Sequence, residues 1–243
     1  IGFKVHLIEG GYKAFRKAVI EDTPRRVAPL QFRVLCGPTG SGKTRLLQAL
    51  AAQGAQVLDL EAIASHRASV LGVIPGQPQP TQKAFETLLW NALRRLDPAR
   101  PVFVEAESKK VGNVTIPDSL IEAMRSSPCV RLDLSLPHRV QLLLEDYDYF
   151  VKDPAFFCDR LDKLIDLKGR ALIDEWKSRV HAGQTAAVVG ELLEKHYDPG
   201  YETSTARNFR HYAQAPALKL DGPDHQAMAD AARHWLEQSA GQA

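Results

Sequence analysis

The sequence contains few cysteines and no long apolar run. Its three cysteines, Cys36, Cys129 and Cys158, are an odd number at wide spacing without a C-x-x-C pair, which argues against a disulfide framework and a zinc site. The apolar runs fall well short of the roughly 20 residues that a membrane-spanning helix needs, and the first residues lack the pattern of a signal peptide. These absences predict a cytoplasmic protein without a membrane span.

An excess of charge of one sign is also absent. Lys and Arg number 31 against 29 Asp and Glu, so the formal net charge is only +2. This balance neither indicates nor excludes a nucleic acid partner, because a nearly neutral protein can still carry a local basic face. The 243 residues suffice for one large α/β domain, or for one domain with a smaller appendage.

Apolar segments typical of strands alternate with helical patterns after residue 28. Strands are predicted at 32–36, 55–60, 101–107, 129–135 and 215–221, and the main helices at 44–53, 83–96, 116–127 and 224–238. Alternation of this kind predicts an α/β fold of the P-loop NTPase-like class, a parallel sheet with helices on both faces. A Gly/Pro-rich loop is predicted at 70–82, and a helical insertion at 137–200.

The segment before this pattern is predicted to be separate from the main domain. Residues 21–30, EDTPRRVAPL, are rich in proline and charge and are typical of a linker. We therefore expect a domain boundary near residue 28, with residues 1–27 outside a main domain that covers residues 28–243.

Residues 37–44, GPTGSGKT, match the complete pattern G-x-x-x-x-G-K-[ST] between a predicted strand and a predicted helix. Glycines there let consecutive N–H groups form an anion nest at a helix N-terminus. We expect Lys43 to contact the terminal phosphates and Thr44 to ligate magnesium; a glycine-rich turn with an incidental lysine is the alternative. The predicted phosphate-binding residues are Gly37, Pro38, Thr39, Gly40, Ser41, Gly42, Lys43 and Thr44.

Acidic residues follow the neighbouring strands, where ligands collect in open α/β sheets. Glu105 and Glu107 lie on one side of the 101–107 strand by alternation, so we expect both to act with Lys43 in catalysis and Glu105 to hold magnesium with Thr44. A solvated strand end is the alternative. Asp133 is a further candidate after the 129–135 strand. Asp59 and Glu61 are weaker candidates, since Asp59 could equally cap the following helix.

Basic and aromatic groups follow, each with a simpler alternative. Ser108, Lys109 and Lys110 lie at the same predicted mouth and could contact a second anion such as RNA, or form a solvated turn. One arginine of the helical insertion could reach the phosphates, although each alone is more typical of a surface charge; the candidates are Arg139, Arg160, Arg170 and Arg179. The tyrosines of EDYDYF (145–150) and HYDPGY (196–201) could stack on a base or pack internally.

Several segments together resemble the carboxyl-terminal P-loop domain of the tRNA 2-selenouridine synthases. They are GGYKAFR (10–16), GPTGSGKT (37–44), VLDLE (57–61), LGVIPGQPQPTQKAFE (71–86), FVEAESKKVGNVTIP (103–117), RVQLLLEDY (139–147) and HYDPGY (196–201). They span most of the chain in the family's order. The P-loop alone would indicate only a phosphate ligand, whereas the 81–86 and 103–117 segments make the resemblance specific.

The resemblance implies a tRNA-modifying transferase. Family members join a rhodanese domain to this P-loop domain, geranylate 2-thiouridine at the wobble position from geranyl diphosphate, and displace the geranylthio group with selenophosphate. By position, Gly37 to Thr44 would bind the phosphate or diphosphate, beside Glu105, Glu107, Ser108 and Lys109. Residues 1–27 would be the tail of the rhodanese domain, whose catalytic cysteine has no counterpart here, so we expect a fragment rather than a natural short form.

Two other classes of function fit the residues alone. The same phosphate cradle serves ATP in phosphotransferases and ATPases, in which case Thr44 and Glu105 would hold magnesium. A non-catalytic tRNA-binding module is the other alternative. Magnesium-dependent ATP turnover without tRNA would favour the first, and salt-sensitive RNA binding that phosphate ligands do not affect would favour the second.

Overall fold

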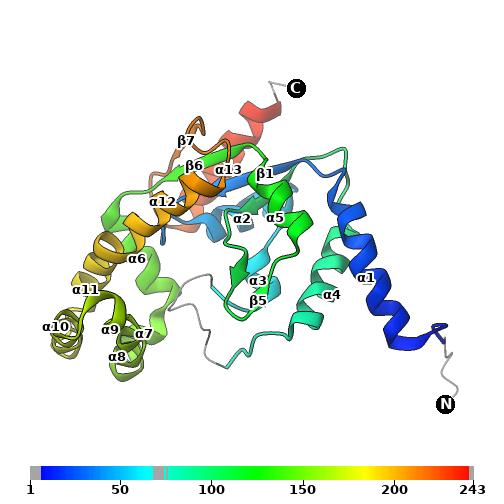
Figure 1. The fold of residues 1–243 in the computed structure, drawn as a ribbon. Coiled ribbons are helices and arrows are strands. Elements are labelled where there is room, and N and C mark those ends of the chain that lie inside the picture. The colour runs from blue at the N-terminus through cyan, green and yellow to red at the C-terminus, as the bar shows by residue number, and fades with distance from the viewer. Residues whose placement is uncertain (1–6, 68–73, 75, 241–243) are drawn as a thin grey trace, which may run out of the picture.

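The computed structural model describes residues 7–67, 74 and 76–240, and a parallel five-stranded sheet lies at its centre (Figure 1). The strand order is β2-β3-β1-β6-β7, and all neighbouring pairs are parallel. The strands are β1 (Phe32–Cys36), β2 (Gln56–Leu58), β3 (Val102–Glu105), β6 (Cys129–Asp133) and β7 (Ala217–Lys219). The predicted α/β fold class is therefore confirmed.

Alternation along the central strands divides the core into two layers. In β1, Val34 and Cys36 belong to one hydrophobic cluster and Leu35 to the other. In β3, Val104 belongs to the first cluster and Phe103 to the second. Both faces of the sheet are thus apolar, and a sheet of this kind is stable only when helices cover both faces.

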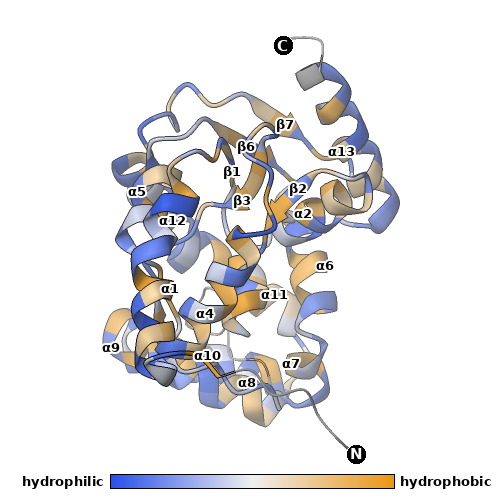
Figure 2. Cartoon of the chain, turned by 90° about the vertical axis from the view of Figure 1, so that its right-hand side faces the viewer, coloured by the Kyte–Doolittle hydropathy of each residue, from blue (hydrophilic) through white to orange (hydrophobic). Residues whose placement is uncertain are grey.

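Helices cover the two faces as this alternation requires. Helices α2 (Lys43–Ala52) and α13 (His225–Ala240) pack together on one face, where Leu46, Leu50 and Met228 join Leu35 in the core. The other face is covered by α3 (Leu60–Ala64), α4 (Gln82–Leu93) and α5 (Asp118–Arg125). A short hairpin, β4 (Lys110–Val111) and β5 (Val114–Thr115), lies beside α4. Figure 2 shows the most apolar colours on the strands and on the inner sides of these helices.

The linker predicted at residues 21–30 is mostly helical, which corrects the sequence interpretation. Helix α1 (Gly11–Val27) continues through Pro24 and packs against α4 and α5. Arg16 forms a buried ion pair with Glu86, and the indole of Trp90 donates a hydrogen bond of 2.9 Å to Asp22. These tertiary contacts override the local signal of proline and charge. The predicted tail therefore packs against the main domain, as far as it lies within the described residues.

A second group of helices, from Leu136 to Asn208, lies to one side of the sheet (Figure 1, lower left). It has its own apolar core around Trp176, Phe157 and Leu164. It extends eight residues beyond the predicted end at 200 because α12 continues to Asn208. Its elements are α6 (Leu136–Asp146), α7 (Asp148–Lys152), α8 (Pro154–Leu161), η1 (Asp162–Leu164), α9 (Ile165–Lys168), α10 (Arg170–His181), α11 (Thr185–Leu192), η2 (Leu193–Tyr197) and α12 (Asp198–Asn208).

Two other sequence predictions concern the loop at 70–82 and a membrane span. Most of the first half of that loop lies outside the described residues. At the end of the loop, Thr81 caps α4 by accepting a hydrogen bond from the N–H of Ala84. In the part of the chain that the structure describes, no helix combines the length and the apolar character required to cross a bilayer.

Candidate phosphate-binding site

The P-loop connects the end of β1 to the start of α2, at the carboxyl edge of the sheet. Gly40 and Gly42 have φ angles of 76° and 86°, a conformation that side chains other than glycine rarely adopt. A Cβ atom at Gly42 would also lie 2.5 Å from Cε of Met228. The backbone conformation therefore favours glycine at this position, whereas the flexible end of the Met228 side chain could move away from a Cβ atom.

Lys43, the first residue of α2, points back along the loop. Its ammonium group donates a hydrogen bond of 2.7 Å to the carbonyl of Gly37 and a longer one of 3.4 Å to that of Pro38, and it lies 5.5 Å from the ring centre of Tyr201. The hydrogen bonds of Lys43 are to neutral carbonyl groups and not to a carboxylate. The charge is thus available to a phosphate group in the adjoining cleft.

The loop forms one wall of a cleft of about 520 Å³. Among the carboxylates that line the same cleft, three form a cluster: Glu61 from α3, Glu105 from the end of β3, and Glu107 from the loop that follows β3. One oxygen of each lies within 4.8 Å of the others. The structure therefore brings both predicted catalytic glutamates together with Lys43, and it adds Glu61, which the sequence ranked lower.

The environment of these carboxylates disfavours their charged forms. Burial is the largest effect, followed by the negative charge of Glu61, and together they raise the pKa of Glu105 to about 8. The pKa of Glu107 is raised by burial, by Glu61 and by Glu105. The positive charge of Lys43 acts in the opposite direction on both. A cation in the cleft would favour the ionised forms, because it stabilises the negative charges directly.

The residues present fit a magnesium ion. The hydroxyl of Thr44 is hydrogen-bonded to Glu105, and Oε1 of Glu105 is buried without a hydrogen-bond partner among the described residues. Clustered carboxylate and hydroxyl oxygens are the ligands that magnesium prefers. Thr44 and Glu105 would hold the ion, with Glu61 and Glu107 nearby.

The helical segment supports the P-loop from the side opposite the sheet. The guanidinium of Arg139 in α6 donates two hydrogen bonds to the carbonyl of Thr39, at 3.0 and 2.7 Å, and two to the carboxylate of Asp198, at 2.9 and 2.6 Å. The N–H of Gly37 donates a hydrogen bond of 2.5 Å to the hydroxyl of Tyr201. Two loop residues are therefore fixed by side chains of α6 and α12.

Comparison with known proteins identifies the family. The family model of the tRNA 2-selenouridine synthase AAA domain matches residues 30–163. The tRNA 2-selenouridine synthase of Alcanivorax borkumensis is 42% identical over 149 residues, which are 60% of this chain and 40% of the relative. That of Shewanella loihica is 30% identical over 98% of this chain and 68% of the relative.

The chain belongs to the tRNA 2-selenouridine synthase family. A third relative, from Nitrosomonas europaea, is 40% identical over 60% of this chain and 38% of its own length. The chain thus spans about two fifths of the length of the first relatives that it matches. The segments GGYKAFR and TQKAFE, which carried the resemblance to this synthase family, contact each other through the ion pair of Arg16 with Glu86.

Of the further polar residues predicted near the P-loop, Ser108 lines the cleft. The others lie elsewhere. Lys109 pairs with Asp118 at 2.5 Å, Lys110 is exposed on β4, and Asp133 is exposed at the end of β6. None of these three is among the residues that line the cleft.

None of the four arginines considered for the phosphates is among the residues that line the cleft. Arg139 is buried, and its hydrogen bonds to Thr39 and Asp198 occupy it, so it positions the loop. Arg67, directly after α3, lines the cleft instead, with its guanidinium 4.5 Å from the ring centre of Tyr147. No sequence motif marked Arg67, because only the folded chain brings α3 beside the P-loop.

Asp59 also lines the cleft. Its hydrogen bond to the backbone supports the helix-capping role that was one of its two predicted roles. Its Oδ1 accepts a hydrogen bond of 2.8 Å from the N–H of Ala62, so it is the N-cap of α3.

We expect Asp59→Ala to lower the free energy of unfolding by about 1 kcal/mol and Asp59→Asn, which keeps a capping oxygen, to lower it much less. Urea unfolding of both variants measures the difference. An equal loss in the two would contradict the capping role.

Proposed function

We propose that this chain carries out the phosphate-dependent chemistry of tRNA 2-selenouridine formation. In this proposal, 2-thiouridine at the wobble position is first S-geranylated from geranyl diphosphate. Selenophosphate then displaces the geranylthio group. The observation that carries the proposal is a phosphate-binding loop and an apolar wall in one cleft, in a chain that belongs to the tRNA 2-selenouridine synthase family.

The apolar wall supports a prenyl diphosphate as the ligand. Leu142 and Leu143 of α6, with Ile74, line the cleft beside Thr39 and Gly40 of the loop. An apolar crevice continues from Thr39 between α6, α7 and α11, but its volume is only about 30 Å³. A geranyl chain would therefore lie along the wall of the larger cleft, where apolar burial favours binding by roughly 25 cal/mol per Å².

The charges near the loop suit a diphosphate leaving group. The thiocarbonyl sulfur attacks C1 of the geranyl group, the C1–O bond breaks with its electron pair leaving on the diphosphate, and the N3 proton of the thiouracil ring is released to solvent. Lys43 and the loop N–H groups stabilise the negative charge that grows on the departing oxygen. A bound magnesium ion would add positive charge for the same oxygens. In the selenophosphate step, the loop would hold the phosphate group of that substrate.

A nucleotide-dependent reaction is the competing function, and one observation favours it. Thr44 and Glu105 are hydrogen-bonded to each other, and β3, which ends at Glu105, pairs directly with β1, which leads into the loop. The same arrangement of P-loop threonine and acidic residue serves magnesium and ATP in phosphotransferases and ATPases.

Mass spectrometry of wobble nucleosides tests the proposal against this competitor. Incubation of 2-thiouridine-containing tRNA with this chain and geranyl diphosphate is expected to yield S-geranyl-2-thiouridine and an equal amount of diphosphate. ATP turnover without tRNA, together with unmodified nucleosides, would replace the proposal by the nucleotide-dependent function. RNA binding without either reaction would indicate a non-catalytic module.

A further inference from the structure

A second cavity, of about 300 Å³, lies beside the phosphate cleft. It is enclosed between α12, the end of α5 and the residues after β3. It shares Thr39, Glu107, Ser108 and Tyr201 with the phosphate cleft. A ligand in this cavity would therefore be adjacent to the ligand of the P-loop. The volume of the cavity is at the lower end of the range for small-molecule sites, about 300–1,000 Å³.

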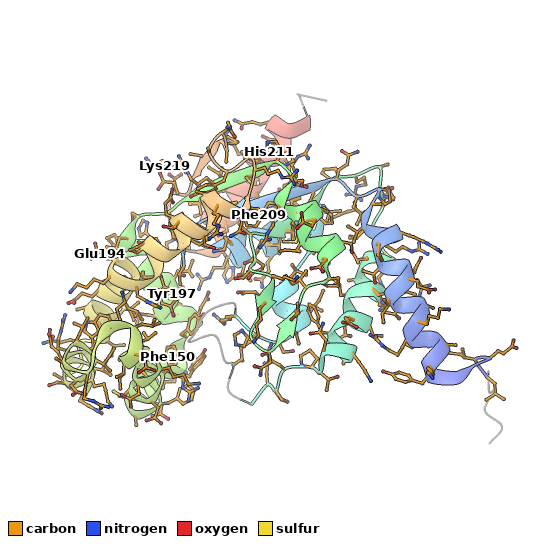
Figure 3. All side chains as sticks on the ribbon, in the orientation of Figure 1. Phe150, Glu194, Tyr197, Phe209, His211 and Lys219 are labelled. Atoms are coloured by element: carbon orange, nitrogen blue, oxygen red, sulfur yellow. The ribbon has the colours of Figure 1, made fainter. Side chains whose placement is uncertain are left out.

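Aromatic rings and uncharged polar groups line this cavity. Tyr197, Tyr201 and Phe209 supply the rings. Figure 3 labels Tyr197 and Phe209, which flank the two ends of α12. The amide of Asn208 lies one turn from Ser204 and donates a hydrogen bond of 2.7 Å to its carbonyl. Rings that provide stacking surfaces, together with an amide that provides both a donor and an acceptor, are the groups that recognise nucleobases.

Two nitrogen-containing side chains complete the lining. Burial, followed by the charge of Lys168, lowers the pKa of His196 and so favours its neutral form. The Nε of Arg125, at the last turn of α5, is buried and has no hydrogen-bond partner among the described residues. Arg125 is among the residues that line the cavity, and its guanidinium carries several N–H donors.

We propose that this cavity binds a single unpaired nucleobase and that, within the proposed function on which this inference rests, the base is the thiolated uracil of the tRNA. Enzymes that modify a base in a folded RNA take it out of the stack and enclose it in a pocket of this kind. The shared wall formed by Thr39, Glu107 and Ser108 would place the base beside the diphosphate of the other substrate.

Exposed positive charge next to the cavity favours a base that belongs to an RNA strand. Arg207 and Arg210 immediately flank Asn208 and Phe209, and both are exposed. Guanidinium groups at such positions contact backbone phosphates and thereby orient a nucleic acid. A free nucleotide would use the stacking surfaces but would lack most of these phosphate contacts.

Gly200 offers a way to fill the cavity without disturbing the core. It lines the cavity within α12, and a Cβ atom there would meet no atom within 4 Å. We expect Gly200→Phe to weaken binding of an anticodon stem-loop RNA that contains 2-thiouridine by at least about tenfold, since stacking of one base contributes roughly 1–3 kcal/mol. Ala206→Phe, on an exposed position of the same helix that does not line the cavity, is the matched control and should bind normally.

Fluorescence anisotropy with the labelled stem-loop measures these affinities, and inorganic diphosphate binding is measured in parallel. Diphosphate affinity should be the same in both variants. Competition with 2-thiouridine 5′-monophosphate and with ATP distinguishes a free nucleotide from a base within RNA. Stem-loop binding that is equal in Gly200→Phe and Ala206→Phe, or preferential binding of ATP in the cavity, would overturn the base site alone. No stem-loop binding to the unchanged chain would overturn the proposed function and the base site with it.

Discussion

Lys43→Ala is expected to reduce the rate of diphosphate release from geranyl diphosphate by about 100-fold or more. Removal of one preorganised donor from a developing anion typically costs a factor of 10² to 10³, and Lys43 supplies a full positive charge whose hydrogen bonds are to neutral carbonyl groups. The substitution also removes the charge that lowers the pKa of Glu105 and Glu107. Both carboxyl groups should therefore become harder to ionise.

Isothermal titration with geranyl diphosphate, combined with an assay of released diphosphate, measures the effect of Lys43→Ala. Lys110→Ala is the matched control, because Lys110 is exposed and does not line the cleft. Its affinity and rate should equal those of the unchanged chain. Identical behaviour of the two alanine variants would rule out a role for Lys43 in diphosphate binding.

Arg139→Leu is expected to lower the free energy of unfolding by about 3 kcal/mol, since it removes a buried guanidinium together with its hydrogen bonds to the carbonyl of Thr39 and to the partly exposed carboxylate of Asp198. Here the unpaired groups would be the carboxylate of Asp198 and the carbonyl of Thr39. For a chain of this size, such a loss lowers the melting temperature by on the order of 10 °C. Because Thr39 belongs to the P-loop, affinity for diphosphate should fall as well.

Thermal unfolding and diphosphate titration of Arg139→Leu test both effects, and Arg179→Leu provides the comparison. Arg179 also forms ion pairs, with Glu175 and Glu191, but it is more exposed and lies on α10. Its removal should cost less than about 1 kcal/mol and leave diphosphate affinity unchanged. A similar loss of affinity in both variants would contradict the positioning role of Arg139.

Local signals in the sequence were sufficient for the loop and the fold class. Of the two glycines that the P-loop pattern requires, Gly42 adopts a positive φ, and Gly40, at a variable position of the pattern, adopts one as well. Alternation along 101–107 predicted that Glu105 and Glu107 lie on one side, and both line the cleft. These features depend on neighbours within a few residues, which a sequence pattern records directly.

The remaining features depend on contacts between distant segments. Arg139 is 100 residues from Thr39, and Tyr201 is 164 residues from Gly37. Glu61 approaches Glu105 because β2 pairs with β3, and strand order cannot be read from periodicity. The helix α1 was missed for a related reason, since its stability comes from contacts with α4 and α5 and not from its own composition.

The position of Thr39 has a thermodynamic consequence. Thr39 lines the phosphate cleft, the neighbouring cavity and the apolar crevice at once, and Arg139 joins its carbonyl to Asp198 at the start of α12. A ligand that displaced Thr39 would change the walls of all three spaces, and its binding would then be coupled to the occupation of the others. Such coupling is reciprocal: the factor by which the first substrate alters the affinity for the second equals the factor by which the second alters the affinity for the first.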